Sequence, residues 1–214
     1  MQWSDEGYLL SKNNFDENSL IIETLTKDHG KYTGIVYGGS SRKLKKIFQV
    51  GNKIMLNFKS KSENKTGYFS VELIKAISPL FFEDKRKTTS ILSASSLLKI
   101  LLPERQINKK IYLSYEKLLN EMFDKNWIIK YICWEFMLIK DLGYEINFDE
   151  NNFVKLNNKT FKIPEIFKKN VKSETSLINI KEGLSFNKNL LIEYFIIPNR
   201  LNFPNFRNIL EKYY

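Results

Sequence analysis

The first 78 residues alternate between apolar and polar positions in short runs that are typical of β-strands. Residues 52–59 give the clearest pattern, with Ile54, Leu56 and Phe58 on one face and mostly polar side chains on the other. Four further strands are expected at residues 7–11, 18–25, 32–37 and 68–78, the last with Phe69, Val71 and Leu73 on one face. Five short strands in so small a region predict a closed barrel, because closure removes exposed strand edges.

The pattern changes at Pro79, and apolar residues follow helical spacing from about residue 88. Helices are expected at residues 88–102, 111–123, 126–142, 175–186, 188–197 and 204–213. Residues 148–156 and 159–163 flank Asn157-Asn158 and predict a short hairpin. The fold class is therefore α+β: an N-terminal OB-fold barrel at residues 1–79, and an all-helical domain at residues 80–214 with a β-hairpin insertion.

Several residues are expected to define helix ends or the helical core. Thr88-Thr89-Ser90 and Asn202 are candidate N-caps, and Pro103 and Gly143 are candidate stops. Within one helix Trp127, Tyr131 and Trp134 share a face. We expect that face, and Cys133 beside it, to be buried, because an aromatic face inside an apolar helix is more often core than a base-stacking platform.

Positive charge is concentrated in one part of the sequence. The net charge is +10 with a pI near 9.4. Residues 1–25 hold one lysine against five acidic residues, whereas residues 26–65 hold ten basic residues against two acidic ones. This concentration favours a polyanionic partner such as nucleic acid. The alternative is a compositional bias toward Lys, Asn and Ile, in which the lysines only form a solvated surface.

The sequence argues against an enzyme. His29 is the single histidine, so a nucleophilic triad would have to use it, but it lies in a predicted turn beside Asp28 and Gly30, where a local hydrogen-bonding or phosphate-contacting role is expected. Cys133 is the single cysteine, so zinc sites of four Cys and His ligands have too few residues and an internal disulfide is excluded. A G-x-x-x-x-G-K-[ST] phosphate loop is absent. The acidic pairs Asp5-Glu6 and Asp16-Glu17 are expected at exposed positions. No apolar run approaches the ~20 residues of a membrane span and no export signal is evident, so a cytoplasmic location is expected.

A binder of single strands needs a positive groove for the backbone and aromatic faces for the bases. Tyr32, Tyr37, Phe48 and Tyr68 are interleaved with the basic residues, and one or two of them are expected to remain free for stacking. The expected DNA-binding residues are Lys31, Tyr37, Arg42, Lys43, Lys45, Lys46, Lys53, Lys59, Lys61, Arg105, Lys109 and Lys110.

Residues 26–51 combine four closely spaced glycines with a basic segment. The order of Asp5-Glu6-Gly7, Thr26-x-Asp28-His29-Gly30, Gly38-Gly39-x-Ser41-Arg42, Gln49-x-Gly51 and Leu101-Leu102-Pro103-Glu104-Arg105 resembles that of the RecO family of bacterial DNA repair and recombination mediators. The resemblance covers nearly the whole chain and implies the same barrel and helical domain.

The resemblance also implies a function and partners. A member of this family would bind single- and double-stranded DNA, anneal complementary strands, and act with RecR to load RecA onto DNA coated by single-strand binding protein, whose C-terminal tail it would bind near Lys130 or Lys140. Many members carry a four-cysteine zinc site, but this chain lacks those cysteines. Residues 146–165 are therefore expected to be a reduced, metal-free remnant of that module, and no cofactor is expected.

Two other functions are compatible with the sequence. A basic barrel with helices could bind structured RNA, which a competition assay between folded RNA and single-stranded DNA would test. Alternatively, the helical domain could be a protein–protein adaptor with an incidentally basic barrel. Unchanged function after reversal of the charges at residues 42–46 would favour this second alternative.

Overall fold

The computed structural model describes the whole chain except residues 42–43, 63–65, 145, 147–152, 157–158 and 168–175. The chain divides into two compact units, residues 1–113 and 114–214. Helix α2 (Lys109–Glu121) begins in the first unit and ends in the second. The boundary at residue 79 that the sequence suggests marks the end of the barrel region, and as a domain boundary it stays a prediction.

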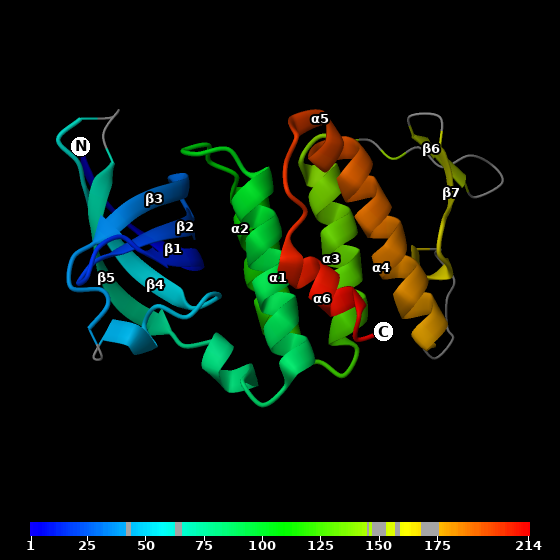
Figure 1. The fold of residues 1–214 in the computed structure, drawn as a ribbon, viewed down its shortest axis with the longest axis horizontal. Helices are drawn as coiled ribbons and strands as arrows, with labels where there is room; N and C mark the ends of the chain where they lie inside the picture. Colours follow the sequence, from blue (N-terminus) through cyan, green and yellow to red (C-terminus); the bar gives the residue numbers. More distant parts are fainter. Residues whose placement is uncertain (42–43, 63–65, 145, 147–152, 157–158, 168–175) are drawn as a thin grey trace. The chain divides into compact units, whose positions relative to one another are not determined.

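The first unit is built on a closed five-stranded barrel (Figure 1). Its strands are β1 (Gln2–Asn14), β2 (Leu20–Thr26), β3 (Gly30–Val36), β4 (Lys53–Lys59) and β5 (Gly67–Lys75). They close in the order β1-β2-β3-β5-β4, with β3 and β5 parallel and the other neighbours antiparallel. The five predicted strands and the OB-fold are therefore confirmed, with boundaries that differ by a few residues.

Alternation along the strands decides which side chains fill the barrel. Ile54, Leu56 and Phe58 are buried as predicted. The buried core cluster is made of Leu9, Leu20, Ile22, Tyr32, Val36, Phe48, Ile54, Leu56, Phe58 and Phe69. Phe69, Val71 and Leu73 share one face as predicted, since they pair opposite Phe58, Leu56 and Ile54, but Leu73 is exposed. β5 pairs with β3 only at its first two residues, so Leu73 lies beyond that pairing, near the end of the strand.

Helix α1 (Lys85–Leu101) follows a short 3-10 turn, η2 (Ser78–Phe81), and begins earlier than the sequence suggests. Asp84 is its N-cap, and its side chain accepts hydrogen bonds from the backbone N–H groups of Arg86 and Lys87. The expected cap at Thr88-Thr89-Ser90 is therefore wrong. Thr88 and Ser90 instead donate their hydroxyls back to carbonyls one turn or more earlier. The helix ends before Pro103, as predicted.

The second unit contains the rest of α2 with α3 (Trp127–Asp141), α4 (Leu177–Leu191), a π-helical turn η4 (Ile192–Ile196), α5 (Ile197–Asn199) and α6 (Asn205–Glu211). Trp127, Tyr131 and Trp134 are buried, as predicted, and Cys133 is partly buried. Burial raises the pKa of its thiol. Gly143, with φ +94°, follows the end of α3 and confirms the predicted stop.

Two predicted helix boundaries in the second unit were wrong. Residues 177–199 form one continuous run and do not break near residue 187. Asn187 is buried there and donates from its side-chain amide to the carbonyl of Ile132, so this polar residue packs inside the unit and does not end the helix. Pro204, with extended backbone angles, occupies the N-cap of α6 in place of Asn202.

A hairpin of β6 (Phe153–Leu156) and β7 (Lys159–Lys162) precedes the 3-10 turn η3 (Glu165–Phe167). These two antiparallel strands agree with the predicted insertion. The predicted turn Asn157-Asn158, residues 148–152 of the first predicted strand and residue 175 of the following predicted helix lie outside the described residues.

A fully buried ion pair joins three helices of the second unit. Arg207 on α6 lies 2.5 Å (Nε) and 3.1 Å (Nη2) from the carboxylate oxygens of Glu135 on α3. It also donates to the carbonyl of Leu184 on α4 at 2.6 Å. Both charged side chains are 0% exposed, and Tyr131 donates its hydroxyl to the same carboxylate. Burial alone lowers the pKa of the guanidinium, but the charge of Glu135 outweighs this and the net shift is upward.

Candidate nucleic-acid interface

Tyr37 and Tyr68 form an exposed aromatic pair on the barrel. Tyr37 follows β3 and is 65% exposed, and Tyr68 is the second residue of β5 and is 43% exposed. Their ring centroids are 6.0 Å apart. The other two aromatic candidates, Tyr32 and Phe48, are buried in the barrel core. The aromatic pair is thus the part of the predicted aromatic set that is available for stacking.

The strand register sets the surroundings of this pair. Ile21 lies opposite Ile35, Ile35 opposite Tyr68, Tyr68 opposite Lys59, and Lys59 opposite Gln2. These residues alternate with the inward-facing core positions and form one row across the outside of the barrel, which we call the outer row. Lys59 is exposed and is therefore the cation directly beside Tyr68 in this row.

The outer row lies between the connections β1–β2 (residues 15–19) and β4–β5 (residues 60–66). In OB-folds, the corresponding loops and the face of strands 2 and 3 bind oligonucleotides. Lys61 is exposed in the second connection, and Phe15 is exposed in the first. Phe15 is not among the residues predicted from the sequence. Its position between two polar, turn-forming stretches was the available signal.

Hydrogen bonds hold the turn that carries Tyr37. Ser40 donates its hydroxyl to the carbonyl of Glu17 at 3.0 Å and its N–H to the carbonyl of Asn18 at 3.4 Å. The β1–β2 connection is itself ordered by Asp16, whose side chain accepts from the N–H groups of Asn18 and Ser19. These hydrogen bonds lower the pKa of Asp16. The turn and the connection therefore support each other beside the aromatic pair.

The opposite end of the β2–β3 face is covered by residues 99–106 of the same unit. Lys31 is buried, and its ammonium donates to the carbonyl of Lys99 at 2.8 Å and lies 3.5 Å from Glu104. Glu104 also accepts from the hydroxyl of Thr33 at 3.1 Å, and Lys99 pairs with Glu23 at 2.7 Å. The Lys31 ammonium is therefore bonded inside the first unit, although the sequence suggested Lys31 for the interface.

Gly30 makes this close approach possible. Its φ is +78°, in the left-handed region, and a Cβ at this position would overlap the backbone carbonyl of Gln106. The backbone N–H of Arg105 donates to the carbonyl of Lys31 at 2.8 Å. The Arg105 guanidinium lies 5.3 Å from the centre of the Tyr32 ring. Arg105 is therefore placed over the barrel and not beside the aromatic pair.

The remaining predicted basic residues differ in their surroundings. Lys46 and Lys110 are exposed. Lys53 is mostly buried and pairs with Glu6 at 3.2 Å, and Lys109 pairs with Asp28 at 2.9 Å. Arg42 and Lys43 lie outside the described residues, as does the side chain of Lys45. The structure therefore brings together Tyr37 and Lys59 from the expected DNA-binding residues, with the aromatic candidate Tyr68 as the neighbour of both.

Asp5 contradicts the expectation of an exposed acidic pair. Its side chain is 4% exposed, accepts from the backbone N–H of Asp28 at 2.8 Å, and lies 2.9 Å from Nδ1 of His29. The His29 ring stacks on Trp3 with centroids 4.1 Å apart and planes 10° from parallel. Asp5 sits on an inward-facing position of β1, so alternation buries it, and the β2–β3 turn supplies its donors. This is the local hydrogen-bonding role anticipated for His29.

Glu6 gives a pH dependence to the stability of the first unit. Burial by itself raises the pKa of its carboxyl, but the hydrogen bonds and charges of Lys53 and Lys27 outweigh burial, and the net pKa is lowered. A carboxyl with a lowered pKa in the folded state stabilises the fold above its unfolded pKa of about 4.3 and loses that contribution as pH falls. We expect Glu6→Gln to cost roughly 1 kcal/mol at pH 7 and much less at pH 3, measured by urea denaturation. An equal cost at both pH values would contradict the assignment.

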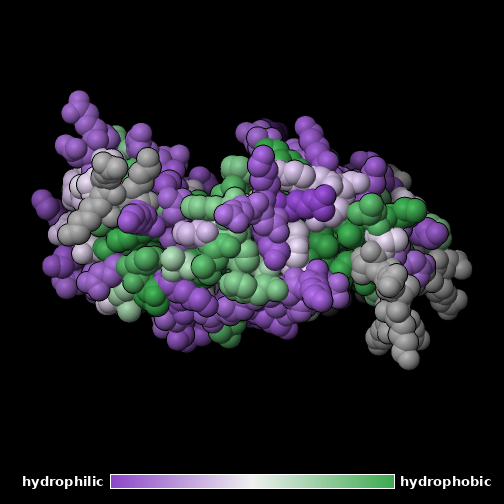
Figure 2. All heavy atoms as spheres, turned by 90° about the horizontal axis from the view of Figure 1, so that it is seen from below, coloured by the Kyte–Doolittle hydropathy of each residue, from purple (hydrophilic) through white to green (hydrophobic). Residues whose placement is uncertain are grey.

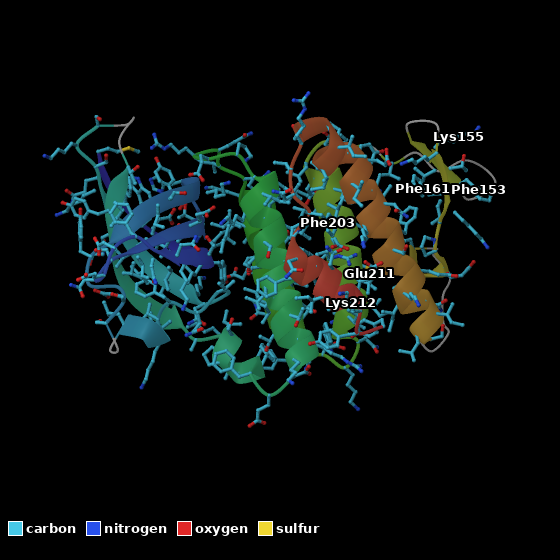
Figure 3. All side chains as sticks on the ribbon, viewed as in Figure 1. Phe153, Lys155, Phe161, Phe203, Glu211 and Lys212 are labelled. Carbon is cyan, nitrogen blue, oxygen red and sulfur yellow. The ribbon has the colours of Figure 1, made fainter. Side chains whose placement is uncertain are left out.

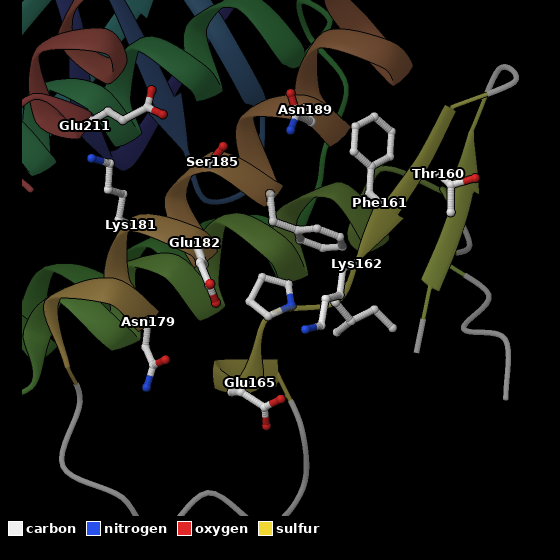
Figure 4. Close-up of a pocket in the computed structure, with 13 residues that line it drawn as sticks. Thr160, Phe161, Lys162, Glu165, Asn179, Lys181, Glu182, Ser185, Asn189 and Glu211 are labelled. Carbon is white, nitrogen blue, oxygen red and sulfur yellow. The ribbon is translucent and has the colours of Figure 1, made fainter. Parts of the chain in front are cut away.

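A separate cavity of about 720 Å³ lies in the second unit. Figure 4 shows its lining side chains coming from α4, from Glu211 at the end of α6, and from β7 and η3. Phe161 of β7 is also labelled on the hairpin in Figure 3. Lys162 and Lys181 line it together with Glu165 and Glu182, so the charges of its wall are mixed. This wall does not single out an anionic ligand.

Figure 2 shows apolar groups interspersed among hydrophilic ones on the face seen from below. Exposed apolar side chains are thus common on this protein, and exposure alone does not mark a site.

Among the described residues, no group of three or more His, Cys, Asp and Glu side chains could hold a metal ion. The expected absence of zinc and other cofactors stays a prediction. None of the helices within the described ranges is long and apolar enough to cross a membrane.

Comparison with known proteins places the chain in a family. Residues 1–77 match the family described as Recombination protein O N terminal, and residues 83–173 match Recombination protein O C terminal. A DNA repair protein RecO from Roseobacter denitrificans is 33% identical over 147 residues, which cover 68% of this chain and 61% of that protein. The RecO of Hyphomonas neptunium is 32% identical over 153 residues, covering 70% and 63%. The chain spans about three fifths of the length of these relatives. The N-terminal region of this family matches the barrel, and its C-terminal region matches the helices that follow. The chain is therefore a member of the RecO family.

Proposed function

We propose that this chain acts in DNA repair and recombination and that its barrel binds single-stranded DNA along the outer row. The observation that carries the proposal is the exposed aromatic pair next to Lys59, between the two loops that flank the ligand face of an OB-fold. Stacking on the aromatic pair would hold bases of any sequence, and Lys59 and Lys61 would neutralise phosphates. The relatives are named DNA repair protein RecO, which supports the same role.

The finer activities follow from the family. The chain would bind double-stranded as well as single-stranded DNA, anneal complementary strands, and act with RecR to load RecA onto DNA coated by single-strand binding protein, while contacting the C-terminal tail of that coat protein. It would do so as a mediator without catalytic activity, in the cytoplasm. Duplex binding would depend on phosphate contacts alone, because paired bases cannot stack on the aromatic pair.

The test is a salt titration of binding to a fluorescent single strand, followed by anisotropy. Wild type is compared with Lys59→Ala/Lys61→Ala and with the matched control Lys155→Ala/Lys162→Ala, two exposed lysines of the hairpin in the second unit. We expect the slope of log K against log salt to become shallower by about 0.7 for each lysine lost at the barrel, and to be unchanged in the control.

The same assay separates the alternatives. A structured RNA that displaces the single strand at equal or lower concentration would favour the RNA-binding alternative. Absence of binding at low salt, or equal slopes for all three proteins, would refute the barrel site and leave the adaptor function as the better explanation.

A further inference from the structure

A second cavity, of about 490 Å³, lies in the first unit next to the turn that carries Tyr37. It is bounded by the end of β1, the start of β2, the turn after β3 and the residue Phe48 before β4. Its volume is within the range of about 300–1,000 Å³ that is usual for small-molecule sites. Its lining residues are Lys12, Asn13, Asn14, Leu20, Gly39, Ser40 and Phe48.

The lining combines an apolar wall with a polar rim. Leu20 and Phe48 belong to the barrel core and supply the wall. Asn13, Asn14 and Ser40 are exposed at the rim and offer both donors and acceptors of hydrogen bonds. Among the described residues of the lining, Lys12 is the one cation and none is acidic. A flat, polar-edged ligand that carries a negative charge fits this combination.

The walls of this cavity are held in place. Ser40 is bound to the β1–β2 connection through the carbonyls of Glu17 and Asn18. Gly39 packs closely on Leu20, because a Cβ at Gly39 would lie 3.1 Å from the Leu20 side chain. Asn13 and Asn14 lie in the β1–β2 register, opposite Ile21 and Leu20. The cavity is therefore a built part of the barrel, and only Gly38 separates its lining residue Gly39 from Tyr37.

We propose that this cavity receives one unstacked nucleobase of a single strand whose neighbouring bases stack on Tyr37 and Tyr68. Asn14, which points to the same side of β1 as its partner Leu20 does on β2, hydrogen-bonds the edge of the base through its amide, and Asn13 borders the rim on the side of the outer row. The ring of the base lies against Leu20 and Phe48, and Lys12 contacts the adjoining phosphate. A paired base presents no free edge, so the cavity selects single strands over duplex. The inference rests on the proposed function, since it adds a base-binding subsite to the same interface.

The experiment combines binding and NMR. Asn13→Ala/Asn14→Ala is compared with Asn202→Ala/Asn205→Ala, two exposed asparagines of the second unit, after circular dichroism has established that both fold. We expect the first variant to bind a single strand about 5- to 100-fold more weakly, as the loss of two hydrogen bonds predicts, and the control to be unchanged. In wild type, the strand should shift the side-chain amide resonances of Asn13 and Asn14. A strand of equal length made of abasic residues should leave them unshifted.

A titration with a free deoxynucleoside monophosphate distinguishes a base supplied by a single strand from a base supplied by a free nucleotide. Shifts of Asn13 and Asn14 by the free nucleotide but not by the strand would overturn the proposal and assign the cavity to free nucleotides. Shifts that the strand produces only at Tyr37 and Tyr68, with unchanged affinity of Asn13→Ala/Asn14→Ala, would also overturn it and leave the proposed function intact. If wild type binds no strand at all, both proposals fail.

Discussion

Replacing Tyr37 and Tyr68 together by alanine should weaken binding of a single-stranded oligonucleotide by about 10²- to 10⁴-fold. Stacking of a base on an aromatic side chain contributes about 1–3 kcal/mol, and both rings are exposed and in contact with each other. The barrel core should be unaffected, because neither side chain belongs to it. Anisotropy titrations at constant salt measure the change directly.

Two controls make this prediction specific. Tyr37→Phe/Tyr68→Phe keeps the rings and should retain most of the affinity. Phe123→Ala/Phe206→Ala removes two exposed aromatic side chains of the second unit and should have no effect on binding. If the alanine variant binds as tightly as wild type, or if the control loses as much affinity, the aromatic pair is not the stacking surface.

Arg207→Ala should destabilise the second unit by about 3–5 kcal/mol. Its loss leaves the carboxylate of Glu135 fully buried without the guanidinium that neutralises it, and leaves the carbonyl of Leu184 without its donor. The same change removes the hydrogen bonds that Arg207 on α6 makes to Glu135 on α3 and to Leu184 on α4. Urea denaturation followed by tryptophan fluorescence would record the loss, because Trp127 and Trp134 lie in α3.

Two further variants separate the effect of the unpaired Glu135 charge on stability from the effect of lost packing. Lys212→Ala removes an exposed cation immediately after α6 and should change stability by less than about 0.5 kcal/mol. Arg207→Met/Glu135→Leu removes both charges and fills their space with apolar groups, so it should recover most of the stability. If the double variant is as unstable as Arg207→Ala, the unpaired charge of Glu135 is not the cause.

The sequence contains enough local information to define the barrel. Alternation at Ile54, Leu56 and Phe58 assigned β4 and its buried face, and turn-forming residues separated the five strands. Helix ends were less predictable where a side chain had a tertiary partner. Asn187 resembles a break between helices, yet it lies inside one helix because it donates to Ile132 on α3. A cap or a break depends on which hydrogen-bond partner the fold supplies, and this partner is distant in sequence.

The candidate interface was likewise only partly predictable from the sequence. Composition selected a basic, aromatic-containing segment, but it could not tell Tyr37 and Tyr68 from Tyr32 and Phe48, because all four lie among lysines. Strand register decided this: it turned Tyr32 inward and set Tyr68 between Ile35 and Lys59. The same register buried Asp5 beside His29, although its sequence neighbours suggested exposure.

The sequence by itself therefore determined the barrel, most of the helices, the positive charge and the resemblance to the RecO family, because periodicity and composition are local properties of the chain. Only the tertiary structure decided which lysines find an acidic partner within the first unit. Lys31, Lys53 and Lys109 pair with Glu104, Glu6 and Asp28, and these partners come together only when the barrel closes and residues 99–113 pack within the first unit. Lys59 remains at the surface because its strand turns it outward beside Tyr68, and no linear pattern of charge contains that information.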